Sequence, residues 1–201
     1  MTATGAGGSS RGLERRTVVQ RLLSDRGGLL VVTGLGSSTW DAAAAGDDAR
    51  NFYLWGAMGG AAAMGMGLAL ARPEHPVLVI TGDGEQLMGL GALATIGARR
   101  PGNLAIVVLD NGLYGETGMQ PSHTSCGTDL AGVAAACGFS WSARVEAMAE
   151  VEALRERIHR CDGPCLASVQ IAADEPPRVL PVRDGVELKN RFRRALALAP
   201  N

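Results

Sequence analysis

Two short, almost wholly apolar runs constrain the fold of this chain most strongly. The first covers residues 77–81 and the second residues 104–109, with a stretch of helical character at 86–99 between them. Runs of this length without polar alternation are typical of strands buried on both faces, as in a parallel sheet. Two such strands joined by a helix predict a βαβ unit.

The residues directly after these two strands are suited to hold a metal ion and an anion. Gly82-Asp83-Gly84 follows the first strand, and Asp110-Asn111 follows the second. Ligands of open α/β sheets bind at the carboxyl ends of the strands, and Mg²⁺ prefers oxygen ligands beside a phosphate. Glycines let backbone N–H groups approach an anion, and a helix beginning near Glu85 directs its positive end there. The pattern predicts a Mg²⁺-diphosphate site, although Gly-Asp-Gly alone is also an ordinary turn.

The rest of the chain alternates between expected helices and strands. Further helices are expected at residues 13–24, 37–45, 57–71, 129–137, 146–160 and 186–198, and further strands at 29–33, 139–143 and 165–171. This alternation predicts an α/β fold, a doubly wound parallel sheet with helices on both faces. We expect a flexible tail at 1–12, one domain at 13–174, and a Pro-rich linker with a C-terminal helix at 175–201.

Composition argues against several classes of function. The net charge is −1 without a basic cluster, so nucleic-acid binding has no electrostatic support. The longest apolar stretch, residues 56–71, is short for a membrane span, and the N-terminus lacks the features of a signal peptide. We therefore expect no membrane partner and a cytoplasmic location. The four cysteines and three histidines are not spaced as metal ligands, and we expect free, buried cysteines.

Around these motifs the chain resembles thiamin diphosphate enzymes, and most of all the sulfopyruvate and phosphonopyruvate decarboxylase group. The segments that carry the resemblance are GDGEQLMGLGALATIGARRPGNLAIVVLDNGLYGETGMQ and, upstream, NFYLWGAMGGAAAMGMGLALARP. The resemblance extends over residues 13–170 and implies the diphosphate-binding (PP) module, with thiamin diphosphate and Mg²⁺ as cofactors. It implies that Asp83, Asn111 and the Leu113 carbonyl bind Mg²⁺. The residues then expected at the cofactor are Gly34, Ser37, Gly56, Met58, Gly82, Gly84, Glu85, Leu113 and Tyr114, with Gly84 and Glu85 donating backbone N–H groups to the diphosphate.

Gly56-Ala57-Met58-Gly59 has a second role by the same resemblance. The Gly56 carbonyl and the Met58 N–H would hold the aminopyrimidine, and the Met58 side chain would wedge beneath the thiazolium. A wedge keeps the cofactor bent, so that its own amino group reaches the reactive carbon. The alternative is a core methionine that fills a gap.

The loop Gly34-Leu35-Gly36-Ser37-Ser38-Thr39 begins like a dinucleotide fingerprint. Thr39 stands where the third glycine belongs, and no acidic residue follows at the expected place, so a nicotinamide or flavin enzyme is poorly supported. We expect Thr33, Gly34 and Ser37 to donate to the diphosphate. A loop that only turns the chain is the alternative.

Thiamin diphosphate enzymes ionise the cofactor with a glutamate on a separate pyrimidine-binding domain, for which we expect no room here. The resemblance therefore implies a β-type subunit of a two-subunit 2-oxo acid decarboxylase. Its partner would be a pyrimidine-binding α subunit that carries the glutamate, in an α₂β₂ or larger assembly. Two alternatives remain: half of a carboligase of the acetolactate synthase or split transketolase type, and a non-catalytic cofactor-binding or regulatory subunit. The sequence identifies neither the 2-oxo acid nor the stoichiometry.

Glu116 is a candidate catalytic residue because it follows the metal ligands closely. A carboxyl group near the thiazolium would protonate the product if burial raised its pKa, whereas a solvated glutamate is the alternative. On the next loop His123, with Gln120 and Ser122, is a candidate for substrate contact. The basic residues of the tail are expected to form a solvated helix face or to dock on the partner; they are Arg183, Lys189, Arg191, Arg193 and Arg194.

Overall fold

The structure is a computed structural model that describes residues 12–198. Except for Gly12, the flexible tail expected at residues 1–12 lies outside the described residues, and so does the end of the chain from residue 199. Among the described residues no helix has both the length and the apolar character needed to span a membrane.

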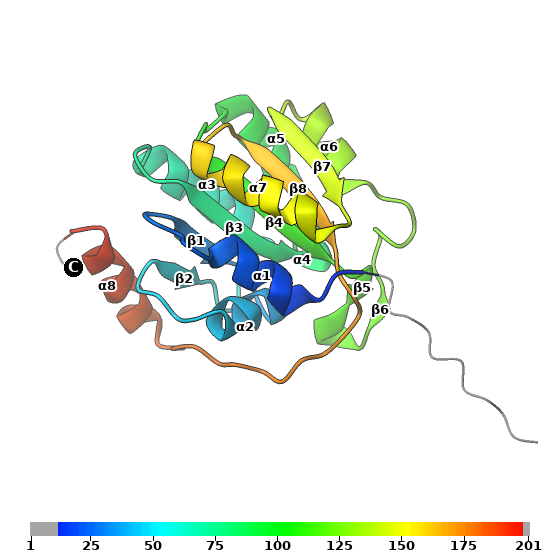
Figure 1. The fold of residues 1–201 in the computed structure, drawn as a ribbon, viewed down its shortest axis with the longest axis horizontal. Helices are drawn as coiled ribbons and strands as arrows, with labels where there is room; N and C mark the ends of the chain where they lie inside the picture. Colours follow the sequence, from blue (N-terminus) through cyan, green and yellow to red (C-terminus); the bar gives the residue numbers. More distant parts are fainter. Residues whose placement is uncertain (1–11, 199–201) are drawn as a thin grey trace, which may run out of the picture.

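Six parallel strands form the central sheet (Figure 1). They are β1 (Leu30–Thr33), β2 (Asn51–Tyr53), β3 (Val77–Gly82), β4 (Leu104–Asp110), β7 (Trp141–Val145) and β8 (Cys165–Gln170). Their order in the sheet is β2-β1-β3-β4-β8-β7. The two apolar runs form the neighbouring strands β3 and β4, and every residue of β4 is buried. The predicted α/β fold with a parallel sheet is confirmed.

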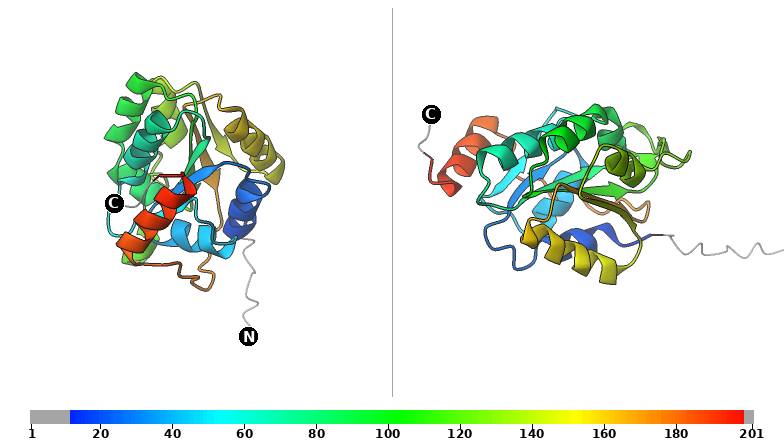
Figure 2. Two further views of the ribbon diagram at one scale, coloured as in Figure 1. Left: turned by 90° about the vertical axis from the view of Figure 1, so that its left-hand side faces the viewer. Right: turned by 90° about the horizontal axis from the view of Figure 1, so that it is seen from above.

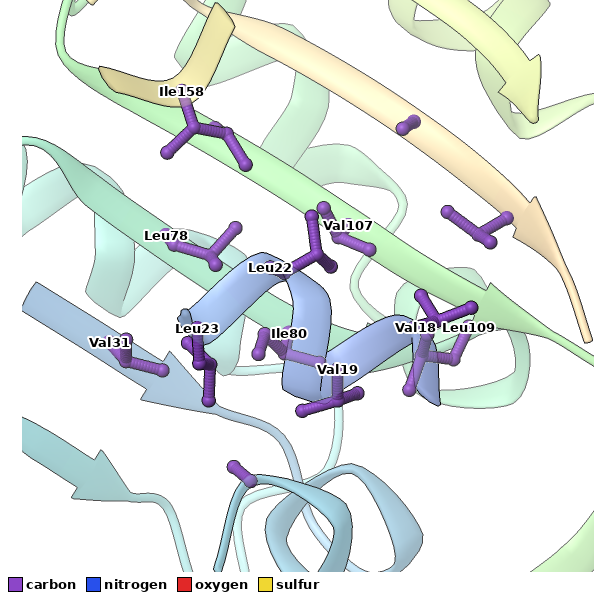
Figure 3. Close-up of a cluster of buried hydrophobic side chains, with 14 of the residues drawn as sticks. Val18, Val19, Leu22, Leu23, Val31, Leu78, Ile80, Val107, Leu109 and Ile158 are labelled. Carbon is purple, nitrogen blue, oxygen red and sulfur yellow. The ribbon is translucent and has the colours of Figure 1, made fainter. Parts of the chain in front are cut away.

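Helices cover both faces of this sheet, as the edge-on views of Figure 2 show. The helices are α1 (Arg15–Leu23), α2 (Ser37–Ala44), α3 (Ala61–Ala71), α4 (Asp83–Met88), α5 (Gly91–Arg99), α6 (Leu130–Ala136), α7 (Met148–Arg160) and α8 (Gly185–Ala195). Buried residues of α1, α2 and α7 pack on one face, and those of α3, α5 and α6 pack on the other. In Figure 3, Val18, Val19 and Leu22 of α1 lie over the strand residues Ile80 and Val107.

One expected helix, residues 86–99, is divided into α4 and α5. The break falls at Gly89, where an added Cβ atom would meet the Gly59 carbonyl oxygen at 2.2 Å. This close approach of two backbones needs a glycine, and Gly89 ends α4 as its C-cap residue. The helix expected from residue 57 begins only at Ala61, the strand expected at 139–143 is Trp141–Val145, and helix α7 begins at Met148 instead of residue 146.

Three strands were not predicted. Edge strand β2 has three residues, too few for a periodic pattern. The other two, β5 (Leu113–Tyr114) and β6 (Gln120–Pro121), form a small antiparallel hairpin around a 3₁₀ turn at Gly115–Thr117. This hairpin follows β4 directly and lies beyond the carboxyl end of the sheet (Figure 1).

The C-terminal part packs against the domain. The segment after β8 runs past α2 and leads to α8 beside β2 (Figure 1). Phe192 of α8 contacts Phe52 edge-to-face with 5.6 Å between ring centroids, and Arg191 forms an ion pair of 2.6 Å with Asp47. The prediction of a solvated basic face is therefore wrong for Arg191. Arg183 precedes α8 and is exposed, as predicted, with its guanidinium 5.5 Å from the Trp55 ring centroid.

The four cysteines are free, but only Cys165 is buried. Cys126 is exposed, and Cys137 and Cys161 are half-buried, so the expectation that all are buried is wrong.

Candidate functional site

The sheet order locates the point at which a ligand is expected. Strand β1 is followed in the chain by β2, its neighbour on one side, whereas β3, its neighbour on the other side, is followed by β4 farther along that side. The connections that leave β1 and β3 therefore run in opposite directions. In open parallel sheets such a switch point, at the carboxyl ends of the strands, is the usual ligand crevice. The loops after β1, β3 and β4 all reach this point.

Most of the predicted site residues line one small cavity at this point, with a volume of about 80 Å³. Those lining it are Ser37, Met58, Gly82, Asp83, Gly84, Glu85, Asn111, Leu113, Tyr114 and Glu116. Two predicted residues do not line it, Gly34, which is buried beside it, and Gly56, which is exposed. Residues that were predicted from four separate segments of the sequence thus share one cavity in the structure.

Asp83 is the buried carboxylate of this cavity. Its side chain is 2% exposed, and burial raises its pKa, an effect to which the nearby Asp110 adds. Hydrogen bonds from the Ser122 and Thr124 hydroxyl groups oppose the shift. Both hydroxyl groups lie within hydrogen-bond distance of the same oxygen, Oδ2, with Thr124 at 3.2 Å. A cation at Oδ1 would stabilise the charged form of this carboxyl group.

Asp110 has a different role from its neighbour Asn111. Its Oδ1 accepts hydrogen bonds from the Gly112 N–H at 3.0 Å and from Thr124 at 2.8 Å. Its Oδ2 accepts from Ser168 and Gln170 on β8 at 3.0 and 3.1 Å. With four donors, Asp110 ties β4 to β8 and to the following loop. Asn111 instead lines the cavity, where its Oδ1 accepts from the Leu113 N–H at 2.9 Å.

The Gly34 N–H is already engaged, because it donates to the Ile80 carbonyl at 2.8 Å. The expectation that Gly34 donates to a diphosphate is therefore not met. Thr33 is likewise engaged through its hydroxyl, which lies 2.6 Å from the Thr39 hydroxyl. Of the three donors expected in this loop, only Ser37 lines the cavity.

Gly34 instead makes room for the side chain of Glu85, since an added Cβ atom would lie 1.6 Å from Glu85 Oε2. Glu85 is 4% exposed, and neither carboxylate oxygen has a hydrogen-bond partner among the described residues. Burial raises its pKa, and polar groups nearby oppose this shift without reaching hydrogen-bond geometry. These groups are the Thr81 hydroxyl and the N–H groups of Leu35, Gly59 and Ala61. The sequence motif predicts a role for the Glu85 backbone only.

Met58 and Tyr114 both lie near Gly84. A Cβ atom added to Gly84 would lie 2.7 Å from the Tyr114 ring and 3.9 Å from Met58 Cε. Met58 is half-buried in the turn before α3 and faces the cavity. The Tyr114 hydroxyl lies 2.6 Å from His123 Nδ1, so the exposed His123 contacts the site through Tyr114.

Glu116 is exposed and lies at the rim of the cavity, beside Gly36. The burial on which its expected proton-transfer role depends is not present in this chain alone. Glu116, Ser37 and Asn111 also line an adjoining pocket of about 250 Å³, which extends to Trp40 and Arg178.

The contacts of Ser122 and Thr124 with Asp83 were not predicted from the sequence. No sequence pattern indicated Thr124, and Ser122 was expected to contact substrate but is fully buried against Asp83. The sequence has several hydroxyl residues at 122–128, and nothing in their spacing distinguishes those that face Asp83.

The cavity therefore joins a buried carboxylate, an amide side chain and Leu113, whose carbonyl is the third expected ligand, to a glycine turn. Oxygen ligands of these kinds suit a divalent cation such as Mg²⁺. The N–H groups of Gly84 and Glu85 belong to the first turn of α4, where backbone donors have no partner within the helix. A cation and a bound anion can be held side by side in such an arrangement.

A known protein family matches most of the chain. Residues 34–169 match the family "Thiamine pyrophosphate enzyme, C-terminal TPP binding domain". The chain is 39% identical over 178 residues to a phosphonopyruvate decarboxylase of Streptomyces viridochromogenes, covering 85% of this chain and 43% of that protein. It is 37% identical over 183 residues to the sulfopyruvate decarboxylase subunit beta of Methanothermobacter thermautotrophicus, covering 90% and 94% respectively.

The chain thus spans under half the length of the Streptomyces phosphonopyruvate decarboxylases that it matches. A solved structure has the same fold: the thiamine diphosphate-dependent 4-hydroxybenzoylformate decarboxylase of Rhodococcus jostii. It superimposes with a TM-score of 0.66 at 21% identity, covering 88% of this chain and 36% of that one.

Proposed function

The chain belongs to the thiamine pyrophosphate enzyme family, and on this premise we propose that it is the β-type subunit of a 2-oxo acid decarboxylase. In this proposal residues 13–174 form the PP module and supply the Mg²⁺-diphosphate half of an active site. A pyrimidine-binding α subunit would supply the glutamate that ionises the cofactor. The relatives named as sulfopyruvate and phosphonopyruvate decarboxylases support a small 2-oxo acid as substrate.

The observation that carries the proposal is the joint lining of one cavity by Asp83, Asn111 and Leu113 beside Gly84. This donor set fits Mg²⁺ with a phosphate, because it offers one carboxylate and two neutral oxygens and leaves further positions to the cofactor. Glycine at position 84 leaves room for the Tyr114 ring beside the backbone. When bound, thiamin diphosphate would supply the nucleophilic carbon and the electron sink for decarboxylation.

An apolar surface supports the proposed partner. Helix α3 has no polar side chain, and it packs on the sheet through Ala62 and Ala69 while Met64 and Leu70 are exposed. Met88 of α4 is also exposed, at 65%. Contiguous exposed apolar surface often marks protein–protein contacts, and we expect the partner to cover these side chains. Helix α3 begins three residues after Met58, so a partner covering it would also lie beside the proposed pyrimidine end of the cofactor.

The experiment that tests the proposal is purification of the chain from its native cells with Mg²⁺ and thiamin diphosphate present. We expect a stoichiometric partner to copurify and the complex to release CO₂ from a 2-oxo acid. Pyruvate, sulfopyruvate and phosphonopyruvate are the substrates to assay, with product analysis to detect carboligation. A chain that purifies alone and does not turn over any of them would contradict the decarboxylase proposal.

Met58 provides a prediction about the wedge. Met58→Ala should reduce kcat/KM of the complex by about 10- to 100-fold, because the cofactor would lose its support and its amino group would be misplaced. Met58→Leu, which has similar volume, should keep most of the activity. The measurement is steady-state kinetics with the cofactor near saturation. Equal activity of the Ala and Leu variants would assign Met58 to gap filling alone.

A further inference from the structure

The turn at residues 122–124 connects three parts of the site that come from different segments. The Ser122 N–H donates to the Gly112 carbonyl at 2.8 Å, which closes the loop around the β5–β6 hairpin. The Ser122 and Thr124 hydroxyl groups reach Asp83 at the end of β3. Thr124 also reaches Asp110 at the end of β4, at 2.8 Å. The turn therefore fixes the relative positions of Asp83, Asp110 and the hairpin that carries Leu113.

The direction of these bonds matters for a metal ion. Both hydroxyl groups lie within hydrogen-bond distance of Asp83 Oδ2, so Oδ1 is the oxygen that they leave for a cation. Because the Ser122 hydroxyl donates to Oδ2 and the Thr124 hydroxyl lies beside it, rotation of the carboxylate about its last torsion would break a hydrogen bond in a buried site. Losing such a bond leaves a buried polar group unsatisfied and is costly.

The hydroxyl protons are too few for every contact. Thr124 has one hydroxyl proton, and its oxygen lies 2.8 Å from Ser122 Oγ, 2.8 Å from Asp110 Oδ1 and 3.2 Å from Asp83 Oδ2. One proton cannot be donated fully to two carboxylates at once. Asp83 and Asp110 thus face each other across a single hydroxyl group, and a divalent cation at Asp83 would offset their mutual repulsion.

We propose that Ser122 and Thr124 are positioning residues of the metal site, which orient Asp83 Oδ1 and the Leu113 hairpin toward the cation before it binds. The proposal rests on the proposed function, since it assumes that Asp83 is a ligand. Groups that orient a metal ligand commonly change metal affinity by about 10- to 100-fold when they are removed.

Thr124→Val tests the proposal because valine keeps the shape of threonine and lacks the hydroxyl group. Thr124→Ser restores the hydroxyl group without the methyl group. Ser125→Ala is the matched control: the Ser125 hydroxyl donates to the Ser122 carbonyl at 2.7 Å within the same turn and touches neither carboxylate. The full chain, in the assembly in which it purifies, is titrated with Mn²⁺ in the presence of thiamin diphosphate. Free Mn²⁺ is followed by electron paramagnetic resonance, and thermal unfolding is measured separately in EDTA.

We expect Thr124→Val to weaken Mn²⁺ binding by about 10- to 100-fold, and Thr124→Ser and Ser125→Ala to stay within about threefold of the unmodified chain. A role in stability alone would lower the melting temperature in EDTA without this change in metal affinity. Unchanged Mn²⁺ affinity of Thr124→Val, with strong binding by the unmodified chain, would overturn the positioning role and leave the proposed function standing. Failure of the unmodified assembly to bind Mn²⁺ with thiamin diphosphate would overturn both.

Discussion

Asp83→Asn is expected to abolish turnover of the complex, with a loss of at least about 100-fold, while the chain still folds and assembles. Asparagine keeps the hydrogen-bond acceptor for Ser122 and Thr124, so the buried turn stays satisfied. It removes the negative charge that holds the cation, and direct loss of a ligand should exceed the effect of losing a group that only orients it. The measurements are the rate of CO₂ release, the Mg²⁺ concentration needed for half-maximal activity, and the size of the assembly.

Asp129→Asn is the control for this variant. Asp129 is the N-cap residue of α6 and lies at the same end of the sheet as Asp83. It is exposed and makes no side-chain capping hydrogen bond. Its replacement should leave turnover within about twofold of the unmodified complex. If Asp83→Asn also turned over normally, the subunit would be a non-catalytic or regulatory one.

The strands of the sheet were predictable where burial alone determines the sequence. Strands β3 and β4 are covered on both faces, so their residues are apolar without alternation and their ends are marked by Gly82 and Asp110. Strand β2 lies at the edge and has only three residues, and its position depends on parallel pairing with β1. The division of α4 from α5 depends on contact between Gly59 and Gly89, which are distant in sequence. Such tertiary contacts leave no local pattern.

For the site, the sequence indicated which backbone segments meet but not where side chains point. Asp83, Asn111 and Leu113 follow strand ends, so the parallel sheet brings them together. The Glu85 side chain turns inward beneath Gly34, and the Gly34 N–H is part of the sheet hydrogen bonding, neither of which the motif reveals. The roles of Ser122 and Thr124 depend on how the β5–β6 hairpin closes on the sheet, and that closure is set by packing across segments.

The largest expected effect on stability comes from Gly97, where α5 packs against the end of α6. A Cβ atom added at this buried position would lie 1.7 Å from the Cys137 carbonyl oxygen. Because backbone atoms cannot move aside without shifting α6, Gly97→Ala should lower the free energy of unfolding by about 3 kcal/mol. For a chain of this length that corresponds to a fall in melting temperature of roughly 6–12 °C. Thermal unfolding followed by circular dichroism measures it.

Gly67→Ala is the matched substitution, because it makes the same chemical change at an exposed helical position. Gly67 lies within α3, and nothing stands within 4 Å of the added Cβ atom. Alanine restricts the unfolded chain and favours the helix, so the free energy of unfolding should rise by up to about 1 kcal/mol. The two substitutions should thus change the melting temperature in opposite directions. If Gly97→Ala also stabilised the chain, α5 and α6 would not be in contact at Cys137, and the packing of this face of the sheet would have to be revised.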